Sequence, residues 1–245
     1  MIPALRQEKI LELLSTNEIA STDSLMKYLG ISVSTLRRDL LKLESEGKIH
    51  LLHGGGVRLP QKTTELNIST KMNLNREEKE IIARKAATYV EDGDVIFLDP
   101  SSTTYWMIPH LAGKQITVIT NGIAHINQLV SLEIPCVMIG GSIKLTTNSC
   151  IGSLTESTMK TFFFNKCFLG ASGFSIQSGI TNHDINERAI KILALKNSTQ
   201  PYFLMDHSKY GVVTMIKVAN LEDYPVLTDR IPSALAGYQN FILCT

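Results

Sequence analysis

Short apolar runs alternate with helical segments in the middle of the chain, and this alternation constrains the fold more than any other feature. The runs have the length of buried strands, and the segments between them carry apolar residues at helical spacing. Strands that alternate with helices form parallel sheets, because a parallel neighbour is reached only through a crossover connection. The chain therefore predicts an α/β domain, with strands at 95–98, 116–119 and 136–139 and helices at 103–111 and 123–130.

Polar residues follow several of these predicted strands, where the chain leaves the sheet. Ligands of parallel α/β sheets bind in such loops, and hydroxyls with free N–H groups at a helix start can bind anions. Taken singly, a hydroxyl at a helix start is more often a simple cap, and one Asp or Lys is more often a surface residue. Because such loops recur in succession, we take these as candidate effector-binding residues: Asp99, Ser101, Ser102, Thr103, Thr104, Asn121, Gly141, Asp184, Glu187, Lys191, Asp206 and Lys209.

The first sixty residues follow a different pattern, of three helices. Apolar residues at helical spacing predict a helix over 6–15, and a second helix starts at the cap residue Ser21 and ends at Gly30. A third helix starts after Ser32 and ends at Gly47, and the short turn before it is typical of a helix-turn-helix. Its expected buried stripe consists of Val33, Leu36, Leu40 and Leu43.

The third predicted helix carries hydroxyls and cations on the side opposite its apolar stripe. Guanidinium groups can read base edges in the major groove, and hydroxyls near a helix N-terminus can bind phosphates. Two arginines on a short helix are equally often an ordinary solvated face, and Asp39 is a candidate partner for an arginine. The candidate DNA-binding residues of this helix and its cap are Ser32, Ser34, Thr35, Arg37, Arg38 and Lys42.

Two short apolar runs enclose a glycine turn directly after the third helix. Residues 48–52 and 57–59 have the length of strands, and the glycines at 54–56 predict a β-hairpin between them. Such a wing can hold His53 and Arg58 against the DNA backbone. Three helices followed by a hairpin, in this order, predict a winged helix-turn-helix.

Composition narrows the class of protein further. Hydrophobic residues make up 44% of the 245 residues and charged residues 19%, which is enough apolar material for a packed core. The net charge of +1 does not itself indicate nucleic-acid binding. No apolar stretch approaches the roughly 18 residues of a membrane span, and the start has no signal-peptide pattern, so we expect a cytoplasmic protein without membrane contact. Four scattered cysteines favour reduced thiols, and we expect neither a metal nor a cofactor.

The N-terminal motif resembles the helix-turn-helix signature of DeoR-type regulators. The resemblance rests on the sequence from Ser32 to Leu40, on Leu43, Glu44 and Gly47, and on the run 53–56, His-Gly-Gly-Gly. It covers residues 3–58 and implies that residues 20–39 form the DNA-reading unit.

The later segments resemble the C-terminal sensor domain of the same family. The matching segments include 99–104, 120–121, 140–141, 179–191, 206–209 and 228–229. The resemblance implies a fold similar to ribose-5-phosphate isomerase that senses a phosphorylated sugar or a related metabolite. Ser101 departs from the family pattern, which has glycine there, and Asn165 stands where an aspartate is common. These departures bear on which effector binds.

We expect four parts along the chain: a DNA-binding domain at 3–58, a linker at 59–74, an effector-sensing α/β domain at 75–235 and a tail at 236–245. Asn75 is the expected cap of a long helix at the start of the sensing domain. Paired half-sites raise the affinity of a short reading helix, so we expect a homodimer or homotetramer on double-stranded operator DNA.

Three functions are open at this stage. The first is a DNA-binding regulator, expected to repress a carbohydrate operon under the control of a sugar phosphate, with no catalytic residues. The second is an aldose–ketose phosphate isomerase with a DNA-binding appendage, in which Glu187 is the base and Lys209 its electrostatic partner. In the third, the C-terminal domain only oligomerises. Because a fold does not imply a function, we favour the first.

Overall fold

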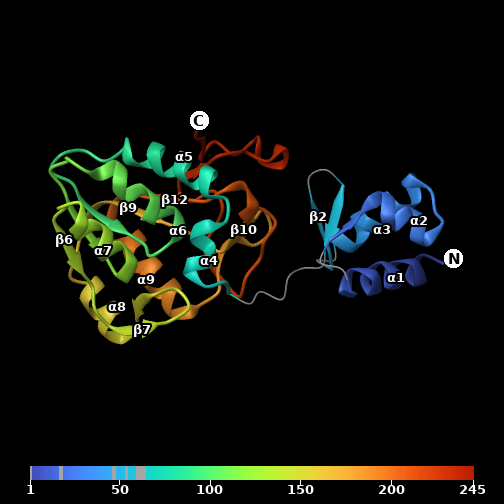
Figure 1. Ribbon diagram of the computed structural model, residues 1–245, viewed down its shortest axis with the longest axis horizontal. Coiled ribbons are helices and arrows are strands. Elements are labelled where there is room, and N and C mark those ends of the chain that lie inside the picture. The colour runs from blue at the N-terminus through green and yellow to red at the C-terminus, as the bar shows by residue number, and fades with distance from the viewer. Residues whose placement is uncertain (1, 17–18, 46–47, 53–54, 59–64) are drawn as a thin grey trace. The chain divides into compact units, whose positions relative to one another are not determined.

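The structure is a computed structural model that describes residues 2–16, 19–45, 48–52, 55–58 and 65–245 (Figure 1). The chain divides into two compact units, residues 1–64 and residues 65–245. Each unit has a hydrophobic core of its own. We describe the units separately.

The first unit contains three helices, α1 (Pro3–Thr16), α2 (Thr22–Leu29) and α3 (Val33–Ser45). The Ser21 hydroxyl accepts a hydrogen bond from the backbone N–H of Ser24 and caps α2, as the sequence predicts. Gly30 ends α2 in the left-handed conformation, with φ of 63°. Leu25, Leu36 and other apolar residues of the three helices form the core of this unit.

The apolar stripe of α3 is confirmed at three positions and wrong at one. Leu36, Leu40 and Leu43 are buried in the core. Val33 is 65% exposed, because it is the first residue of α3 and the core of this unit does not extend to it. The predicted helix end at Gly47 lies outside the described residues.

A three-stranded sheet completes the first unit, with β1 (Ala20–Ser21), β2 (His50–Leu52) and β3 (Gly56–Arg58) in the order β1-β3-β2. Strands β2 and β3 are antiparallel, and Leu51 pairs with the buried Val57. The predicted wing is therefore present as a β-hairpin. His53, the candidate contact in its turn, lies outside the described residues.

The second unit is built on a parallel sheet of seven strands in the order β15-β14-β12-β9-β4-β5-β6. The expected α/β class is confirmed. Because β4 lies inside the sheet, its side chains are buried on both faces, which explains the continuous apolar run at 95–98. The strands are β4 (Val95–Leu98), β5 (Thr117–Thr120), β6 (Cys136–Met138), β9 (Phe164–Leu169), β12 (Ser198–Leu204), β14 (Val226–Thr228) and β15 (Phe241–Leu243).

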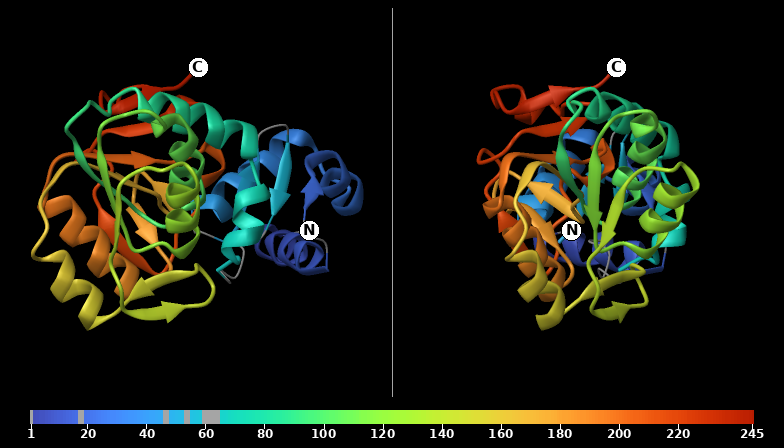
Figure 2. Two further views of the ribbon diagram at one scale, coloured as in Figure 1. Left: turned by 60° about the vertical axis from the view of Figure 1, so that its left-hand side comes forward. Right: turned by 90° about the vertical axis from the view of Figure 1, so that its left-hand side faces the viewer.

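Helices cover both faces of this sheet, with the strands between them (Figure 2, right). Ile96 and Leu98 of β4 pack with the first group of helices, and Phe97 packs with the second. The first group consists of α5 (Arg76–Ala87), α6 (Ser102–Met107), the 3-10 turn η1 (Ile108–Leu111) and α7 (Ile123–Ser131). The second group consists of α8 (Ser153–Met159) and α9 (Ile185–Lys196).

Smaller elements lie around the main sheet. Strands β7 (Ser142–Lys144) and β8 (Ser149–Ile151) form an antiparallel hairpin. A three-stranded sheet packs against the second face and contains β10 (Gly173–Ser175), β11 (Gly179–Asn182) and β13 (Ile216–Ala219). The remaining elements are α4 (Ile68–Asn73) and the 3-10 turns η2 (His207–Lys209) and η3 (Ser233–Leu235).

The expected linker and tail are both partly wrong. Residues 65–74 fold onto the second unit as α4, because Ile68 is buried and its N–H donates to the Thr146 carbonyl at 2.9 Å. Residues 236–245 contain β15, the edge strand of the main sheet. The predicted helix at 103–111 continues as a 3-10 turn from Ile108, because proline stands at its second position.

Phe241 offers a test of the C-terminal strand. It is 7% exposed and contacts the rings of Phe174 and Tyr238. Phe241→Ala should lower the free energy of unfolding of the second unit by about 3–5 kcal/mol, since it removes a buried aromatic ring. Urea unfolding followed through Trp106, the only tryptophan, measures this. Leu243→Ala, 50% exposed on the same strand, is the control and should change it by about 0.5 kcal/mol. Equal small effects would contradict the structural role of β15.

Candidate functional site

The hydroxyls at the start of α3 bond to one another. The Ser32 hydroxyl lies 3.1 Å from that of Ser34 and 3.0 Å from that of Thr35, and it accepts a weak bond from the Thr35 N–H at 3.4 Å. Ser32 therefore acts as the predicted cap. Ser32 and Ser34 are exposed and Thr35 is half-buried, so these hydroxyls can exchange their mutual bonds for bonds to a phosphate.

The cations of α3 point to solvent. Arg37, Arg38 and Lys42 are exposed, and none of them forms an ion pair within the described ranges. Asp39 is buried and pairs with Arg6 of α1, with 2.7 Å between Asp39 Oδ2 and Arg6 Nε. The expected aspartate–arginine pair exists, with a partner outside the reading helix. Because Asp39 turns into the core, the exposed face of α3 carries only positive charge from its first residue to Lys42.

The wing adds a further cation. Arg58 on β3 pairs in register with His50 on β2, and its Nε is buried without a hydrogen-bond partner in the described part of the chain. Burial, and then the charge of Arg58, lower the pKa of His50. His50 is therefore neutral at physiological pH, and Arg58 carries the positive charge of this hairpin.

A buried ion pair lies at the carboxyl edge of the main sheet. Lys191 of α9 donates to Asp99, which directly follows β4, and the N–H of Gly170 after β9 donates to the same carboxylate at 3.0 Å. Burial raises the pKa of Asp99, and the Lys191 ammonium opposes that effect. Asp99 and Lys191, both predicted effector-binding residues, thus lie at this edge, and each neutralises the charge of the other.

The loop after Asp99 divides its hydroxyls between two roles. Ser101 and Thr104 form a capping box at the start of α6, and the Thr104 hydroxyl also contacts His125 Nε2 at 3.0 Å. Burial lowers the pKa of His125 to about 3, so this imidazole is neutral. Ser102 and Thr103 remain, and their hydroxyls have no protein partner among the described residues.

Glu187 on α9 is saturated with hydrogen bonds. Its Oε1 accepts from Lys144 at 3.1 Å and from Thr147 at 2.8 Å, and its Oε2 accepts from Asn182 at 2.8 Å. Asp184 caps α9 through the N–H groups of residues 186 and 187. A carboxylate that holds three donors is poorly suited to act as a base, so this geometry does not favour the isomerase hypothesis.

Lys144 also connects this network to the segment that follows the first unit. Its ammonium lies 2.6 Å from Glu65 Oε2 and 3.4 Å from Asp184 Oδ2. The other oxygen of Glu65 accepts from Lys71 of α4 at 3.0 Å. Burial raises the pKa of Glu65, but the two ammonium groups outweigh it, and the net shift is downward.

A second cluster surrounds Asp206, which follows β12. The Asn75 side-chain amide donates to Asp206 Oδ1 at 3.2 Å and to the Ser208 hydroxyl at 2.8 Å. Asp206 Oδ2 is buried without a partner in the described part of the chain. Asn75 stands at the N-cap position of α5, as predicted, but with φ of 49° its side chain makes no capping bond, because its amide bonds to this cluster instead.

Two lysines lie near the Asp206 carboxylate, and a third, Lys71, lies near both of them. The Lys209 ammonium has no hydrogen-bond or ion-pair partner among the residues described, and burial lowers its pKa. Burial also lowers the pKa of Lys79 to about 8, and this side chain donates to the backbone carbonyls of residues 71 and 74. Lys71 repels both. Lys79 and Lys209 are therefore each affected by the Asp206 carboxylate and by a neighbouring ammonium group.

Asn121 and Gly141, the two remaining candidate effector-binding residues, have mainly structural contacts. Asn121 donates to the Cys150 carbonyl at 2.8 Å, while its Oδ1 is buried without a partner in the described ranges. Gly141 packs so closely on Thr155 that a Cβ would lie 2.0 Å from the threonine hydroxyl. Gly141 therefore brings the β7–β8 hairpin onto α8 and does not itself present a polar group.

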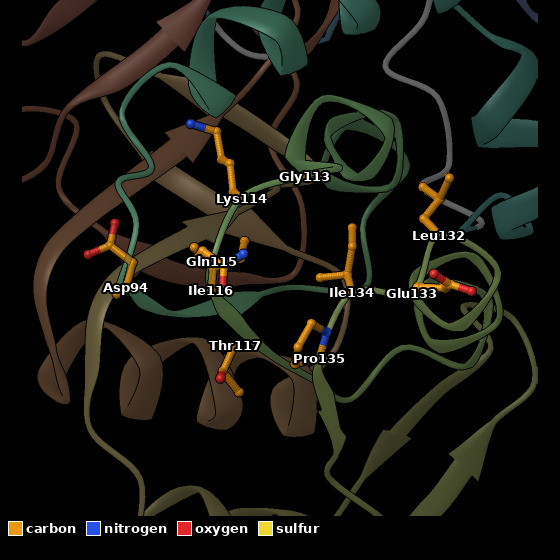
Figure 3. A pocket seen from close by; sticks show the side chains of 11 residues that line it. Asp94, Gly113, Lys114, Gln115, Ile116, Thr117, Leu132, Glu133, Ile134 and Pro135 are labelled. Atoms are coloured by element: carbon orange, nitrogen blue, oxygen red, sulfur yellow. The ribbon is translucent and has the colours of Figure 1, made fainter.

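A cavity of about 490 Å³ lies at the opposite edge of the sheet, where the strands begin (Figure 3). Two of its three charged residues have partners: Asp94 bonds Lys166 at 2.6 Å, and the Lys114 ammonium donates to the Val90 carbonyl, while the third is Glu133. We therefore place the candidate site at the carboxyl edge, where unpartnered polar groups converge.

Family comparison explains why a charged reading helix and a polar strand-end site occur in one chain. The DeoR-like helix-turn-helix domain matches residues 6–62, and the DeoR C-terminal sensor domain matches residues 74–230. The chain belongs to the DeoR family of transcriptional regulators. It is a DNA-binding regulator and not an enzyme.

Individual relatives agree over nearly the whole length. The chain is 34% identical to the HTH-type transcriptional regulator GolR of Listeria innocua, over 98% of this chain and 96% of that protein. It is 34% identical to FruR of Bacillus subtilis, described as an uncharacterized HTH-type transcriptional regulator, over 93% and 91%. It is 34% identical to the lactose phosphotransferase system repressor of Lactococcus lactis, over 84% and 82%.

Solved structures resemble this DeoR-family chain more distantly. Ribose 5-phosphate isomerase A from Neisseria gonorrhoeae is 20% identical over 59% of the chain and 56% of that protein, with a TM-score of 0.41. Within the described ranges, none of the helices has the length and hydropathy of a membrane span.

Several residues of this DeoR-family site were missed by sequence reasoning. Most lie in the expected linker or far along the chain from their partners, and they are Glu65, Lys71, Asn75, Lys79, Lys144, Thr147 and Asn182. The four-residue spacing of Ile68 and Met72 could have indicated α4. No comparable local signal pairs Glu65 with Lys144.

Gly170 tests the packing at the Asp99 site. A Cβ at this position would lie 2.4 Å from the Cβ of Ser101, so Gly170→Ala should destabilise the second unit by about 1–3 kcal/mol. Ser101→Gly alone should cost only a few tenths of a kcal/mol through the weaker cap. In the double variant most of the loss should disappear, because the obstructing atoms are gone. Additive losses in urea unfolding would contradict this close contact.

Proposed function

We propose that residues 65–235 sense a phosphorylated sugar or a related phosphorylated metabolite, and that its binding changes the affinity of residues 3–58 for operator DNA. The observation that supports this most is the Lys209 ammonium, half-buried and unpaired within the described residues, beside an unpartnered oxygen of Asp206. An isolated cation at the carboxyl edge of a parallel sheet is suited to an anionic ligand.

The two clusters supply the two kinds of group that a sugar phosphate needs. Lys209, with Lys71 and Lys79 nearby, attracts the phosphate, and the hydroxyls of Ser102 and Thr103 can donate to its oxygens. The free oxygens of Asp206 and Asn121 can accept bonds from sugar hydroxyls. Among the other candidates, Asp99, Ser101, Thr104, Asp184, Glu187 and Lys191 hold the site in shape, and Gly141 packs on α8.

The segment 65–73 is the proposed connection between effector and DNA. Glu65 is the first described residue after 59–64 and is held by Lys71 and Lys144, both close to the effector clusters. An anion that draws Lys71 toward itself weakens the hold on Glu65. Binding energy can then shift the position of the chain that leads to the DNA-binding unit.

The DNA-binding unit is proposed to contact double-stranded operator DNA through α3 and the wing. Arg37 and Arg38 read bases, and the contacts to phosphate come from Ser32, Ser34, Thr35, Lys42, His53 and Arg58. We propose a cytoplasmic homodimer or homotetramer that represses a carbohydrate operon, since relatives include a lactose phosphotransferase system repressor. An L-fucose operon activator of Haemophilus influenzae, 30% identical, makes the sign of regulation a matter for measurement.

Lys209→Met tests the anion site. Titration calorimetry with a panel of pentose and hexose monophosphates should find ligands that bind the natural protein, with at least about tenfold weaker binding to the variant, the cost of one charged hydrogen bond. Lys160→Met, an exposed lysine at the end of α8, is the control and should bind normally. If no sugar phosphate binds the natural protein while it remains oligomeric, the domain serves assembly alone and the proposal is wrong.

Glu65→Gln tests the connection. Loss of the carboxylate charge should release segment 65–73, so its amide hydrogens should exchange about 10–100 times faster, equivalent to about 1–3 kcal/mol. Operator affinity without ligand should change in the direction that saturating ligand produces in the natural protein. Glu80→Gln removes an exposed pair with Arg76 and should change neither quantity. If amide hydrogen exchange in segment 65–73 and the effect of the ligand on operator affinity are both unchanged in Glu65→Gln, Glu65 has no part in the mechanism.

A further inference from the structure

Two aliphatic side chains are exposed on the helix that carries the DNA-binding arginines. Val33 is 65% exposed and Leu41 is 51% exposed, although the core of this unit takes up Leu36, Leu40 and Leu43 of the same helix. The other exposed side chains from Ser34 to Lys42 are hydroxyls or cations. These two residues therefore need an explanation other than the folding of their own unit.

Val33 and Leu41 lie on one row along the surface of α3. Residues four apart in a helix are neighbours on one face, so Val33, Arg37 and Leu41 form a continuous ridge with the arginine at its centre. The ridge borders the strip that contains Ser34 and Arg38. An arginine that enters the major groove from this ridge brings both aliphatic side chains toward the bases beside it.

The major groove offers one apolar group to such side chains. Among the four bases, only thymine presents a methyl group there, and aliphatic side chains contact it in known complexes. Residues in the first turns of a reading helix approach the base edges, and Val33 is the first residue of α3. Lys42, exposed near the end of the same helix, is the cation that complements a phosphate beside the groove.

Resting on the proposed contact of α3 with operator DNA, we propose that Val33 and Leu41 are specificity-determining residues that contact thymine methyl groups on the two sides of the base pair read by Arg37. Water leaves both the side chain and the methyl group when they meet, so the contact favours thymine over the other bases. Arg37 supplies the polar contact between them, and a guanine is its preferred partner. Each half-site should therefore contain a guanine with thymines on both sides, on either strand.

The test replaces single thymines by deoxyuridine, which removes only the methyl group. The full-length protein first selects its operator from a pool of random double-stranded DNA, and each thymine of that operator is then replaced in turn. The natural protein should lose about three- to tenfold in affinity at two thymines of each half-site. Val33→Ala should abolish the loss at one of them, and Leu41→Ala should abolish the loss at the other.

Leu5→Ala, an exposed leucine of α1, is the control and should keep both losses. Arg37→Ala should weaken binding to every operator that contains the guanine, so that DNA reading by α3 is checked independently of the thymines. If Val33→Ala and Leu41→Ala keep the full deoxyuridine losses, the proposal is wrong. If they instead change only the dissociation of the oligomer, measured by sedimentation, the exposed ridge is a contact between protomers and the proposal is also overturned.

Discussion

The buried pair of Asp99 and Lys191 is the interaction around which the sensing unit is organised. It joins the end of β4 to α9, and the Gly170 N–H brings the end of β9 to the same carboxylate. Two opposite charges that are both buried are stable only together, because either one alone would be left without compensation. The pair therefore fixes the loops after β4 and β9 against α9, and Ser102 lies three residues after Asp99 on the first of these loops.

A chain of ionic contacts extends from this edge to the beginning of the unit. Glu187 lies close enough to raise the pKa of Asp99, and it binds Lys144, which binds Glu65. Glu65 in turn holds Lys71, whose charge lowers the pKa of Lys209. Because Lys144 is shared among Glu65, Asp184 and Glu187, a change at Glu65 alters the balance of charge at the other two carboxylates. In the proposed mechanism, an anion that draws Lys71 away from Glu65 acts through this chain on residues that it does not touch.

Hydrophobic periodicity and capping residues predicted the individual helices and strands well. Contacts between residues far apart in the sequence could not be predicted in this way. Ser21 and Gly30 act within a few residues, so their roles could be inferred from the sequence. Glu65 and Lys144 lie far apart in the sequence, and nothing in the residues around either one indicates that they form an ion pair. Asparagine is a residue type that commonly caps helices, yet the side-chain amide of Asn75 donates to Asp206 and Ser208 instead. Val33 fits the helical spacing of Leu36, Leu40 and Leu43, but it is exposed because the core of the first unit does not extend to it.

The low net charge of +1 is compatible with DNA binding because charge is separated by position. Asp39 is the acidic residue nearest to Arg37 and Arg38 along α3, and it is buried against Arg6, so every charged side chain on the exposed face from Val33 to Lys42 is a cation. A few cations supply limited non-specific affinity, since that affinity depends on how many phosphates are neutralised. Such a protein depends more on base contacts and on paired half-sites than a highly basic one does. In that setting the aliphatic contact that we propose for Val33, although small in free energy, takes a large share in the choice of operator.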